Sequence, residues 1–180
     1  MRRFGLILAL ALSTAAVVVG SAGSAHVRSS FQVTVEETTS ASANGLTLVS
    51  ELEGSYNVAD KTASGDGTYE VLAGSTEIDH GTFTLTRLIT FQFYGCGEVT
   101  LEDGTRIGLP PDFCGGRALF RIHFTSFTGE EGTAQYEVNC QIHNPGGQAP
   151  PGTSEGVKAN ARGVNFNRHV TGDNLFVMLP

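Results

Sequence analysis

Apolar and polar residues alternate along most of the chain after residue 30, and this two-residue period predicts β-strands with one buried face. The longest such stretch spans residues 81–94, where threonines alternate with apolar side chains. Arg87 interrupts the apolar face and Leu88 interrupts the polar face, so we expect a β-bulge near the middle of this strand. The predicted inward positions of this strand are Phe83, Leu85, Ile89, Phe91 and Phe93.

The best-defined hairpin joins residues 118–127 to residues 133–143. With a turn at the glycines between them, one register keeps the apolar side chains of both strands on a single face. That register places His123 opposite Glu137. The predicted inward positions are Ala118, Phe120, Ile122 and Phe124 on the first strand, and Ala134, Tyr136, Val138, Cys140 and Ile142 on the second.

Other turn and loop signals are spread along the chain. Asn44-Gly45 and Asp103-Gly104 are dipeptides typical of two-residue hairpin turns. Residues 54–67 and residues 144–156 are small and polar without a regular period, which predicts loops. No stretch outside the N-terminal segment has ten residues of helical period.

These signals predict an all-β fold, a single antiparallel β-barrel or β-sandwich of roughly ten short strands. We expect a bulge at Gly163 and a turn at residues 171–174 before a last strand. The barrel is slightly favoured, because long consecutive antiparallel strands close naturally into a ring and thereby remove exposed sheet edges.

The first 25 residues are predicted to be a cleaved signal peptide. Two arginines precede an apolar run over residues 4–20, and small residues lead to a cleavage site expected after Ala25. The alternative is an uncleaved membrane anchor, which is less favoured because no basic or aromatic flank follows the run. We therefore expect a secreted, extracellular protein in which residues 26–180 form one β domain, with no stable membrane insertion after cleavage.

The charge of the chain argues against several classes of partner. The sequence has 11 Lys and Arg against 18 Asp and Glu, a formal net charge of −7, and loss of Arg2 and Arg3 makes it more negative. The acidic residues are scattered and no basic cluster is present. Nucleic acids and anionic membranes would be repelled, so neither is expected as a partner.

Three cysteines allow one disulfide bond in an oxidising compartment. Cys96 and Cys114 flank a short insertion, and we expect them to pair, with a stabilisation of about 3 kcal/mol from loop closure. Cys140 lies on an apolar strand face, where a free thiol behaves as a small hydrophobic side chain. Pairing of Cys96 with Cys140 is the alternative. No CxxC pair supports a zinc site, and the sequence indicates no metal and no cofactor.

Common catalytic and nucleotide-binding motifs are absent from the sequence. The candidate site is the polar face of the hairpin formed by residues 118–143, which carries Arg121, His123 and Glu137. If that face lined a barrel mouth, Glu137 would orient the imidazole and Arg121 would hold an anion. The alternative is a solvated face with an ordinary charge pair, worth well under about 1 kcal/mol.

The sequence favours a secreted, non-enzymatic binding or interaction domain. Its partner would be an unidentified small molecule, an envelope component or an extracellular protein. One alternative is a small β-barrel enzyme of cyclase or isomerase type that uses Arg121, His123 and Glu137. A further alternative is a secreted protein inhibitor that acts through an exposed loop at residues 109–116 or 144–156.

Overall fold

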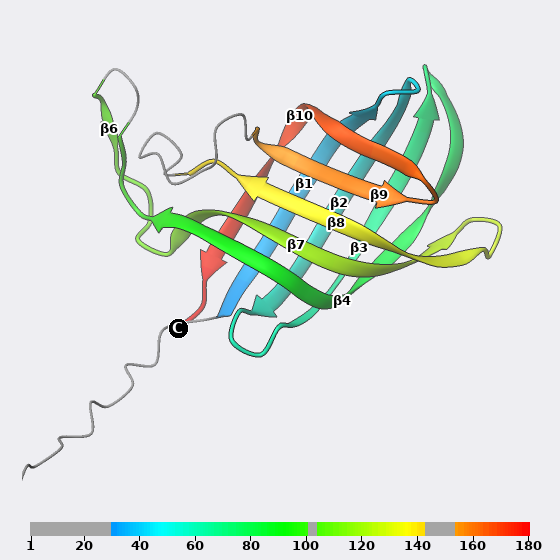
Figure 1. Ribbon diagram of the computed structural model, residues 1–180. Coiled ribbons are helices and arrows are strands. Elements are labelled where there is room, and N and C mark those ends of the chain that lie inside the picture. Colours follow the sequence, from blue (N-terminus) through cyan, green and yellow to red (C-terminus); the bar gives the residue numbers. More distant parts are fainter. Residues whose placement is uncertain (1–29, 101–103, 143–153) are drawn as a thin grey trace, which may run out of the picture.

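The computed structural model describes residues 30–100, 104–142 and 154–180, which form an all-β protein (Figure 1). Eight antiparallel strands form a closed barrel in the order β1-β10-β9-β8-β7-β4-β3-β2, and β5 pairs with β6 in a separate hairpin. Figure 1 shows this hairpin standing away from the barrel. The strands are β1 (Ser30–Ser42), β2 (Leu46–Asn57), β3 (Thr62–Ala73), β4 (Thr76–Cys96), β5 (Val99–Thr100), β6 (Arg106–Ile107), β7 (Phe113–Ser126), β8 (Glu131–Cys140), β9 (Gly156–Ala161) and β10 (Val164–Met178).

Three sequence predictions concern residues outside the described part of the chain. These are the signal peptide at residues 1–25, most of the loop at residues 144–156, and Asp103 of the Asp-Gly turn. Among the described residues, no helix has the length and apolar character needed to cross a membrane.

The first and last barrel strands close the ring. Phe31 on β1 lies opposite Met178 on β10, and the pairing continues along both strands to Ser42 and Phe166. The other side of β1 pairs with β2. Every barrel strand therefore has a partner on both sides. Of the two predicted architectures, barrel and sandwich, the chain adopts the barrel.

The predicted loop at residues 54–67 is wrong, because these residues continue β2 and β3 around a turn at residues 58–61. The small residues permit a close approach of the two strands. Gly54 lies opposite Gly65, and a Cβ on Gly65 would lie 2.4 Å from the Cα of Gly54. The small residues of this segment therefore reflect tight backbone packing rather than an irregular loop.

The predictions for the last part of the chain also need correction. Gly163 does not form a bulge but shares with Arg162 a tight turn between β9 and β10, with φ angles of 50° at Arg162 and 79° at Gly163. Residues 171–174 do not turn but continue β10. Gly172, with a φ of 100°, gives room for Thr38 on β1, so this glycine marks an irregularity inside a strand.

The predicted bulge in β4 is confirmed. The register between β4 and β7 shifts between Leu85 and Arg87, and it shifts again directly after Leu88. These shifts change which residues face inward. Leu88 is consequently fully buried, whereas Phe93, predicted to point inward, is 46% exposed.

The β7–β8 hairpin has the inward faces that the sequence predicts, but the predicted register is wrong by four residues. His123 lies opposite Thr133 and not opposite Glu137. The reason is the position of the turn: Gly129, with a φ of 81°, ends a three-residue turn. Phe127 therefore leaves the strand instead of pairing with Thr133, and the chain reverses earlier than expected.

The predicted disulfide bond between Cys96 and Cys114 is present, and Cys140 is a buried free thiol. Cys114 lies opposite Cys96 in the register between β4 and β7, so the bond links two neighbouring strands at one end of the barrel. Burial raises the pKa of Cys140 to about 12. This thiol is therefore protonated and unreactive at neutral pH.

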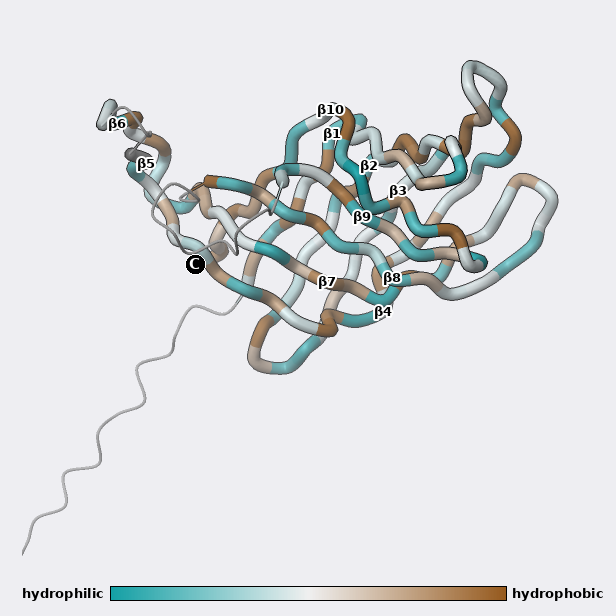
Figure 2. The backbone as a smooth tube through the Cα atoms, turned by 45° about the horizontal axis from the view of Figure 1, so that its top comes forward, coloured by the Kyte–Doolittle hydropathy of each residue, from teal (hydrophilic) through white to brown (hydrophobic). Residues whose placement is uncertain are grey.

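Aromatic side chains fill the barrel at the end where β1 begins and β10 stops. Tyr56 is at the centre of this aromatic cluster, with ring centroids 5.2–5.9 Å from its neighbours. Figure 2 shows hydrophobic and hydrophilic residues following each other along the barrel strands, as one inward and one outward face require. The cluster consists of Phe31, Tyr56, Phe91, Phe120 and Phe176.

Truncation of Phe120 to alanine tests whether this cluster supports the fold. Phe120 is fully buried, so Phe120→Ala should lower the free energy of unfolding by about 3–5 kcal/mol. Phe93→Ala is the matched control, because its ring is half exposed and its loss should cost less than about 1.5 kcal/mol. Urea unfolding followed by circular dichroism measures both values. Equal losses of unfolding free energy in the two variants would show that the aromatic cluster is not the main support of this end of the barrel.

Candidate functional site

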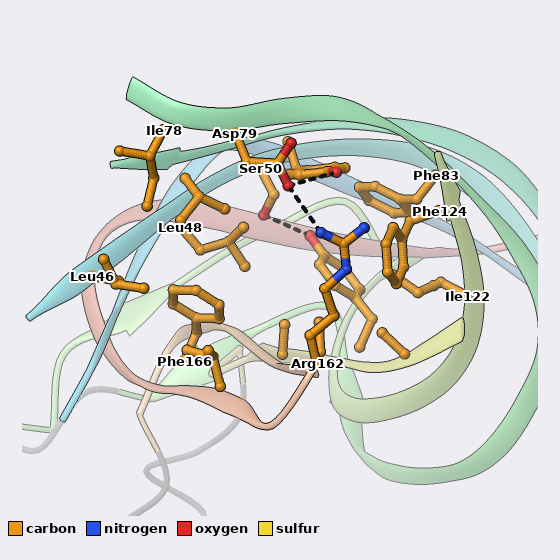
Figure 3. Close-up of a pocket in the computed structure, with 17 residues that line it drawn as sticks. Leu46, Leu48, Ser50, Ile78, Asp79, Phe83, Ile122, Phe124, Arg162 and Phe166 are labelled. Atoms are coloured by element: carbon orange, nitrogen blue, oxygen red, sulfur yellow. Dashed lines mark hydrogen bonds and ion pairs between the residues drawn. The ribbon is translucent and has the colours of Figure 1, made fainter. Parts of the chain in front are cut away.

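A cavity of about 240 Å³ lies at the opposite end of the barrel from the aromatic cluster (Figure 3). Ile78 and Arg162 line it and are themselves exposed, so the cavity reaches the surface between the turns of this end. Its wall is mainly apolar, because the inward faces of seven strands converge there with aliphatic and aromatic side chains. The apolar wall includes Leu48, Phe83, Ile122, Phe124, Ala159 and Phe166.

A hydrogen bond between two hydroxyl groups crosses the interior of the barrel beneath this cavity. Ser50 Oγ lies 2.9 Å from the hydroxyl oxygen of Tyr136, and both residues line the cavity. Ser50 is on β2 and Tyr136 is on β8, which lie on opposite sides of the eight-stranded ring. Both side chains are at most 2% exposed. Burial raises the pKa of Tyr136, so its hydroxyl remains protonated at physiological pH.

Arg162 spans the mouth of the same cavity. Its Nη1 lies 3.7 Å from Asp79 Oδ2 on β4, and its Nη2 lies 3.1 Å from Glu130 Oε2 in the β7–β8 turn. The guanidinium carbon is 4.9 Å from the centre of the Phe124 ring. Figure 3 shows the arginine side chain extending from its turn across the cavity toward Asp79. The positive φ of Arg162, uncommon for a residue with a side chain, is part of the turn that positions it there.

Tyr69 completes the polar group at the mouth. Its hydroxyl donates a hydrogen bond to Asp79 Oδ2 at 3.2 Å. Burial, together with the negative charge of Asp79, raises the pKa of Tyr69 to about 12. Of the residues that the structure describes, the mouth thus carries one cation, two carboxylates and a neutral phenol. The polar groups of the deeper part are the two hydroxyls of Ser50 and Tyr136.

The three residues that the sequence nominated as a site are not brought together. Arg121, His123 and Glu137 all lie on the outer face of the barrel, opposite to the side chains that line the cavity. His123 Nε2 lies 3.8 Å from Glu131 Oε2 rather than near Glu137. Arg121 is exposed and lies opposite Arg87 of β4.

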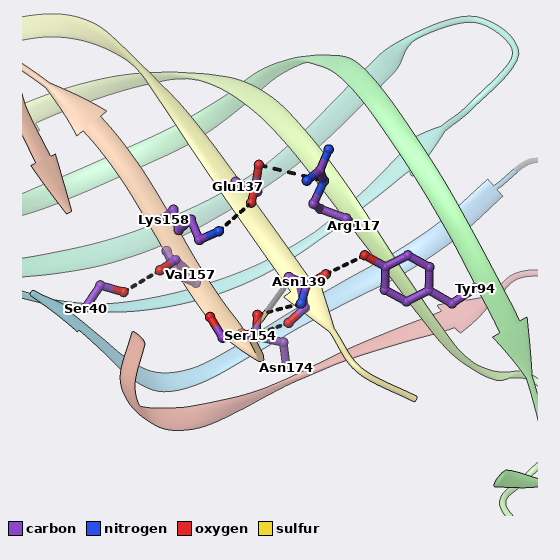
Figure 4. Close-up of polar contacts among 9 residues, drawn as sticks. All are labelled: Ser40, Tyr94, Arg117, Glu137, Asn139, Ser154, Val157, Lys158 and Asn174. Atoms are coloured by element: carbon purple, nitrogen blue, oxygen red, sulfur yellow. Dashed lines mark hydrogen bonds and ion pairs between the residues drawn. The ribbon is translucent and has the colours of Figure 1, made fainter. Parts of the chain in front are cut away.

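Glu137 has different partners from the one expected. Its carboxylate oxygens lie 3.5 Å from Lys158 Nζ on β9 and 3.9 Å from Arg117 Nε on β7 (Figure 4). Both partners are side chains of neighbouring strands on the same outer face. This arrangement is a cross-strand ion-pair group of the kind that stabilises a sheet surface modestly.

The residues that do line the cavity carried weak sequence signals. Ser50 interrupts an inward row that continues with Leu48 and Leu52, and a polar residue at an inward position needs a partner. Tyr136 stands on the predicted apolar face, where a buried phenol also needs a partner. Nothing local links these two residues, because they are 86 positions apart in the chain.

A second buried polar group closes the wall beside β9, where this short strand begins. Tyr94 donates a hydrogen bond to Asn139 Oδ1 at 2.9 Å, and Asn139 Nδ2 donates to the Ser154 carbonyl at 2.6 Å (Figure 4). Asn174 Nδ2 donates to the Asn139 carbonyl and to Glu155 Oε1, each at 3.2 Å. These bonds join β4, β8 and β10 to the segment that precedes β9.

Among the described residues, no group of three or more His, Cys, Asp or Glu side chains could hold a metal ion. The cavity itself contains hydroxyls, a guanidinium group and a carboxylate above an apolar wall. Such a wall with a few polar groups is the usual chemistry of a small-molecule binding site.

Comparisons with known proteins identified no relative of this chain. No protein-family model matches the chain, and neither a curated protein nor a solved structure matches it. Fold and site therefore define a closed antiparallel β-barrel with an internal cavity. Because one fold hosts many functions, the function is inferred from the chemistry of that cavity.

The partly buried Glu155 makes stability dependent on pH. Burial raises its pKa from 4.5 to about 7, although hydrogen bonds from the Gln141 N–H and from Asn174 favour the charged form. The folded state therefore holds this proton more tightly than the unfolded state does. The resulting stabilisation is complete below about pH 4.5 and is lost as the pH rises through 7.

Replacement of Glu155 by glutamine isolates this contribution. Between pH 5 and pH 8, the wild-type protein should lose about 2 kcal/mol more unfolding free energy than Glu155→Gln does. Urea unfolding at both pH values measures the difference, and the variant corrects for all other titrating groups. The same pH dependence in both proteins would show that Glu155 titrates normally in the folded state.

Proposed function

We propose that this protein is a secreted, non-enzymatic binding protein that holds a small, largely apolar molecule in the barrel cavity. The observation that carries the proposal is the cavity between the hydrogen bond of Ser50 with Tyr136 and the Arg162 side chain at the mouth. The apolar wall supplies the affinity, since removing apolar surface from water is favourable by about 25 cal/mol per Å².

The construction of the barrel supports this assignment. The interior of an eight-stranded barrel is wide enough to be filled by side chains or to hold one small ligand. In this chain the aromatic cluster fills one end. At the other end the inward positions include Ala134, Ala159 and Ala161, whose small side chains leave space. A rigid barrel with space at one end binds a ligand with little loss of protein flexibility.

Two features support the proposed extracellular location. The N-terminal segment has the composition of a secretory signal peptide. The disulfide bond between Cys96 and Cys114 suits an oxidising compartment. A secreted carrier or scavenger of an apolar compound would also benefit from the acidic net charge, which keeps it soluble.

A hydrocarbon probe tests the proposed function. α-Methylstyrene should bind to the purified, disulfide-intact protein and shift the amide resonances of cavity residues in two-dimensional NMR spectra. Ala159→Leu should weaken this binding at least tenfold, because the larger side chain occupies the cavity. The titration gives the dissociation constant of both proteins.

Asn160→Leu provides the matched control for added bulk. Asn160 is the next residue of β9 and is exposed on the outer face, so the variant should bind α-methylstyrene as the wild type does. Absence of any hydrocarbon binding to the wild-type protein would refute the proposed function. Equal weakening by Ala159→Leu and Asn160→Leu would place the binding elsewhere.

A further inference from the structure

We infer that the ligand of this cavity is an uncharged molecule with one hydrogen-bond acceptor, such as an apolar ketone or aldehyde, whose oxygen binds at the Ser50–Tyr136 pair. The inference rests on the proposed function and adds the chemical class of the ligand. Three properties of the cavity carry it: an unused hydroxyl proton at its base, the balance of charge at its mouth, and its volume.

The unused proton follows from counting donors. Ser50 and Tyr136 each have one hydroxyl proton, and the hydrogen bond between their oxygens uses only one of the two. Among the described residues, neither hydroxyl has another hydrogen-bond partner. Both groups are buried and line the cavity, so the second proton is available to a ligand atom there. A buried donor without a partner costs free energy, and a carbonyl oxygen of a ligand would satisfy it.

The charges at the mouth disfavour an anionic ligand. Arg162 is already paired with Asp79 and with Glu130, so the group as a whole has one more negative than positive charge. Within the described part of the chain, no Lys or Arg other than Arg162 lines the cavity. A carboxylate deep in the cavity would lose its hydration without gaining a cation, and a carboxylate at the mouth would face two others.

The volume limits the size of the ligand. About 240 Å³ corresponds to about eight water molecules at roughly 30 Å³ each. A compact molecule such as a single substituted ring fits this space, whereas a long acyl chain would extend into solvent. The cavity volume therefore allows ligand preference to be tested with small probes of nearly equal size.

Acetophenone, α-methylstyrene and benzoate form such a set. They share a phenyl ring and differ in the group attached to it: a ketone, its hydrocarbon counterpart and a carboxylate. The wild-type protein should bind acetophenone roughly three- to tenfold more tightly than α-methylstyrene, which is the gain expected from one neutral hydrogen bond. Benzoate should bind at least about tenfold more weakly than acetophenone. NMR titration at constant pH and salt gives all three dissociation constants.

Variants of the hydroxyl pair identify the donor. Ser50→Ala keeps the phenol and Tyr136→Phe keeps the serine hydroxyl, so each single variant should retain a preference for the ketone. The double variant Ser50→Ala/Tyr136→Phe has no hydroxyl at the base and should lose the preference while still binding α-methylstyrene. Removing both partners of a hydrogen bond is far less destabilising than removing one, and hydrocarbon binding verifies that the double variant is folded.

The outcomes separate this inference from the proposed function. Equal affinity of the wild-type protein for the ketone and the hydrocarbon would overturn the inference and leave the binding function standing. A ketone preference that persists in the double variant, or benzoate binding as tight as that of acetophenone, would also overturn it. Failure of both neutral probes to bind would refute the proposed function itself. The wild-type comparison stands even if a variant does not fold.

Discussion

The antiparallel pairing of β1 with β10 is the constraint on which the rest of the structure depends. It joins the two ends of the described chain and converts a sheet with one apolar face into a closed wall. Inward residues of all eight strands then face one another, and the closed wall covers its own apolar face. Opening this pair would expose the aromatic cluster and the cavity together.

The contents of the barrel divide it into two regions. Five large aromatic residues fill the end where β1 begins and β10 stops, with Phe120 and Tyr56 in edge-to-face contact. At the other end, two polar connections cross the ring: the hydroxyl pair of Ser50 and Tyr136, and the ion pairs of Arg162. The space between these two connections is apolar, so a ligand there would meet polar groups only at its base and at its mouth.

Hydrophobic period and turn chemistry predicted the β class, the inward faces of β7 and β8 and the bulge in β4, and the positions of the cysteines favoured the disulfide bond that forms. The errors have separate physical reasons. Residues 54–67 resemble a loop because they are small and polar without a regular period, yet residues 54–57 of β2 pair with residues 62–65 of β3. The β7–β8 register was missed because the position of a turn depends on the φ of one residue, Gly129, and not on the number of glycines nearby.

The sequence by itself determined most of the side chains that face inward, because alternation along a strand is a local property of the backbone. It failed in β4, where register shifts bury Leu88 and expose Phe93. It also favoured the pairing of Cys96 with Cys114 over that of Cys96 with Cys140, since only a short insertion separates the first two, and the structure has the favoured bond. Only the tertiary structure decided where the cavity lies and which polar groups meet in it. Ser50 and Tyr136 belong to opposite walls, and their contact depends on the closure and diameter of the barrel, which no local pattern encodes.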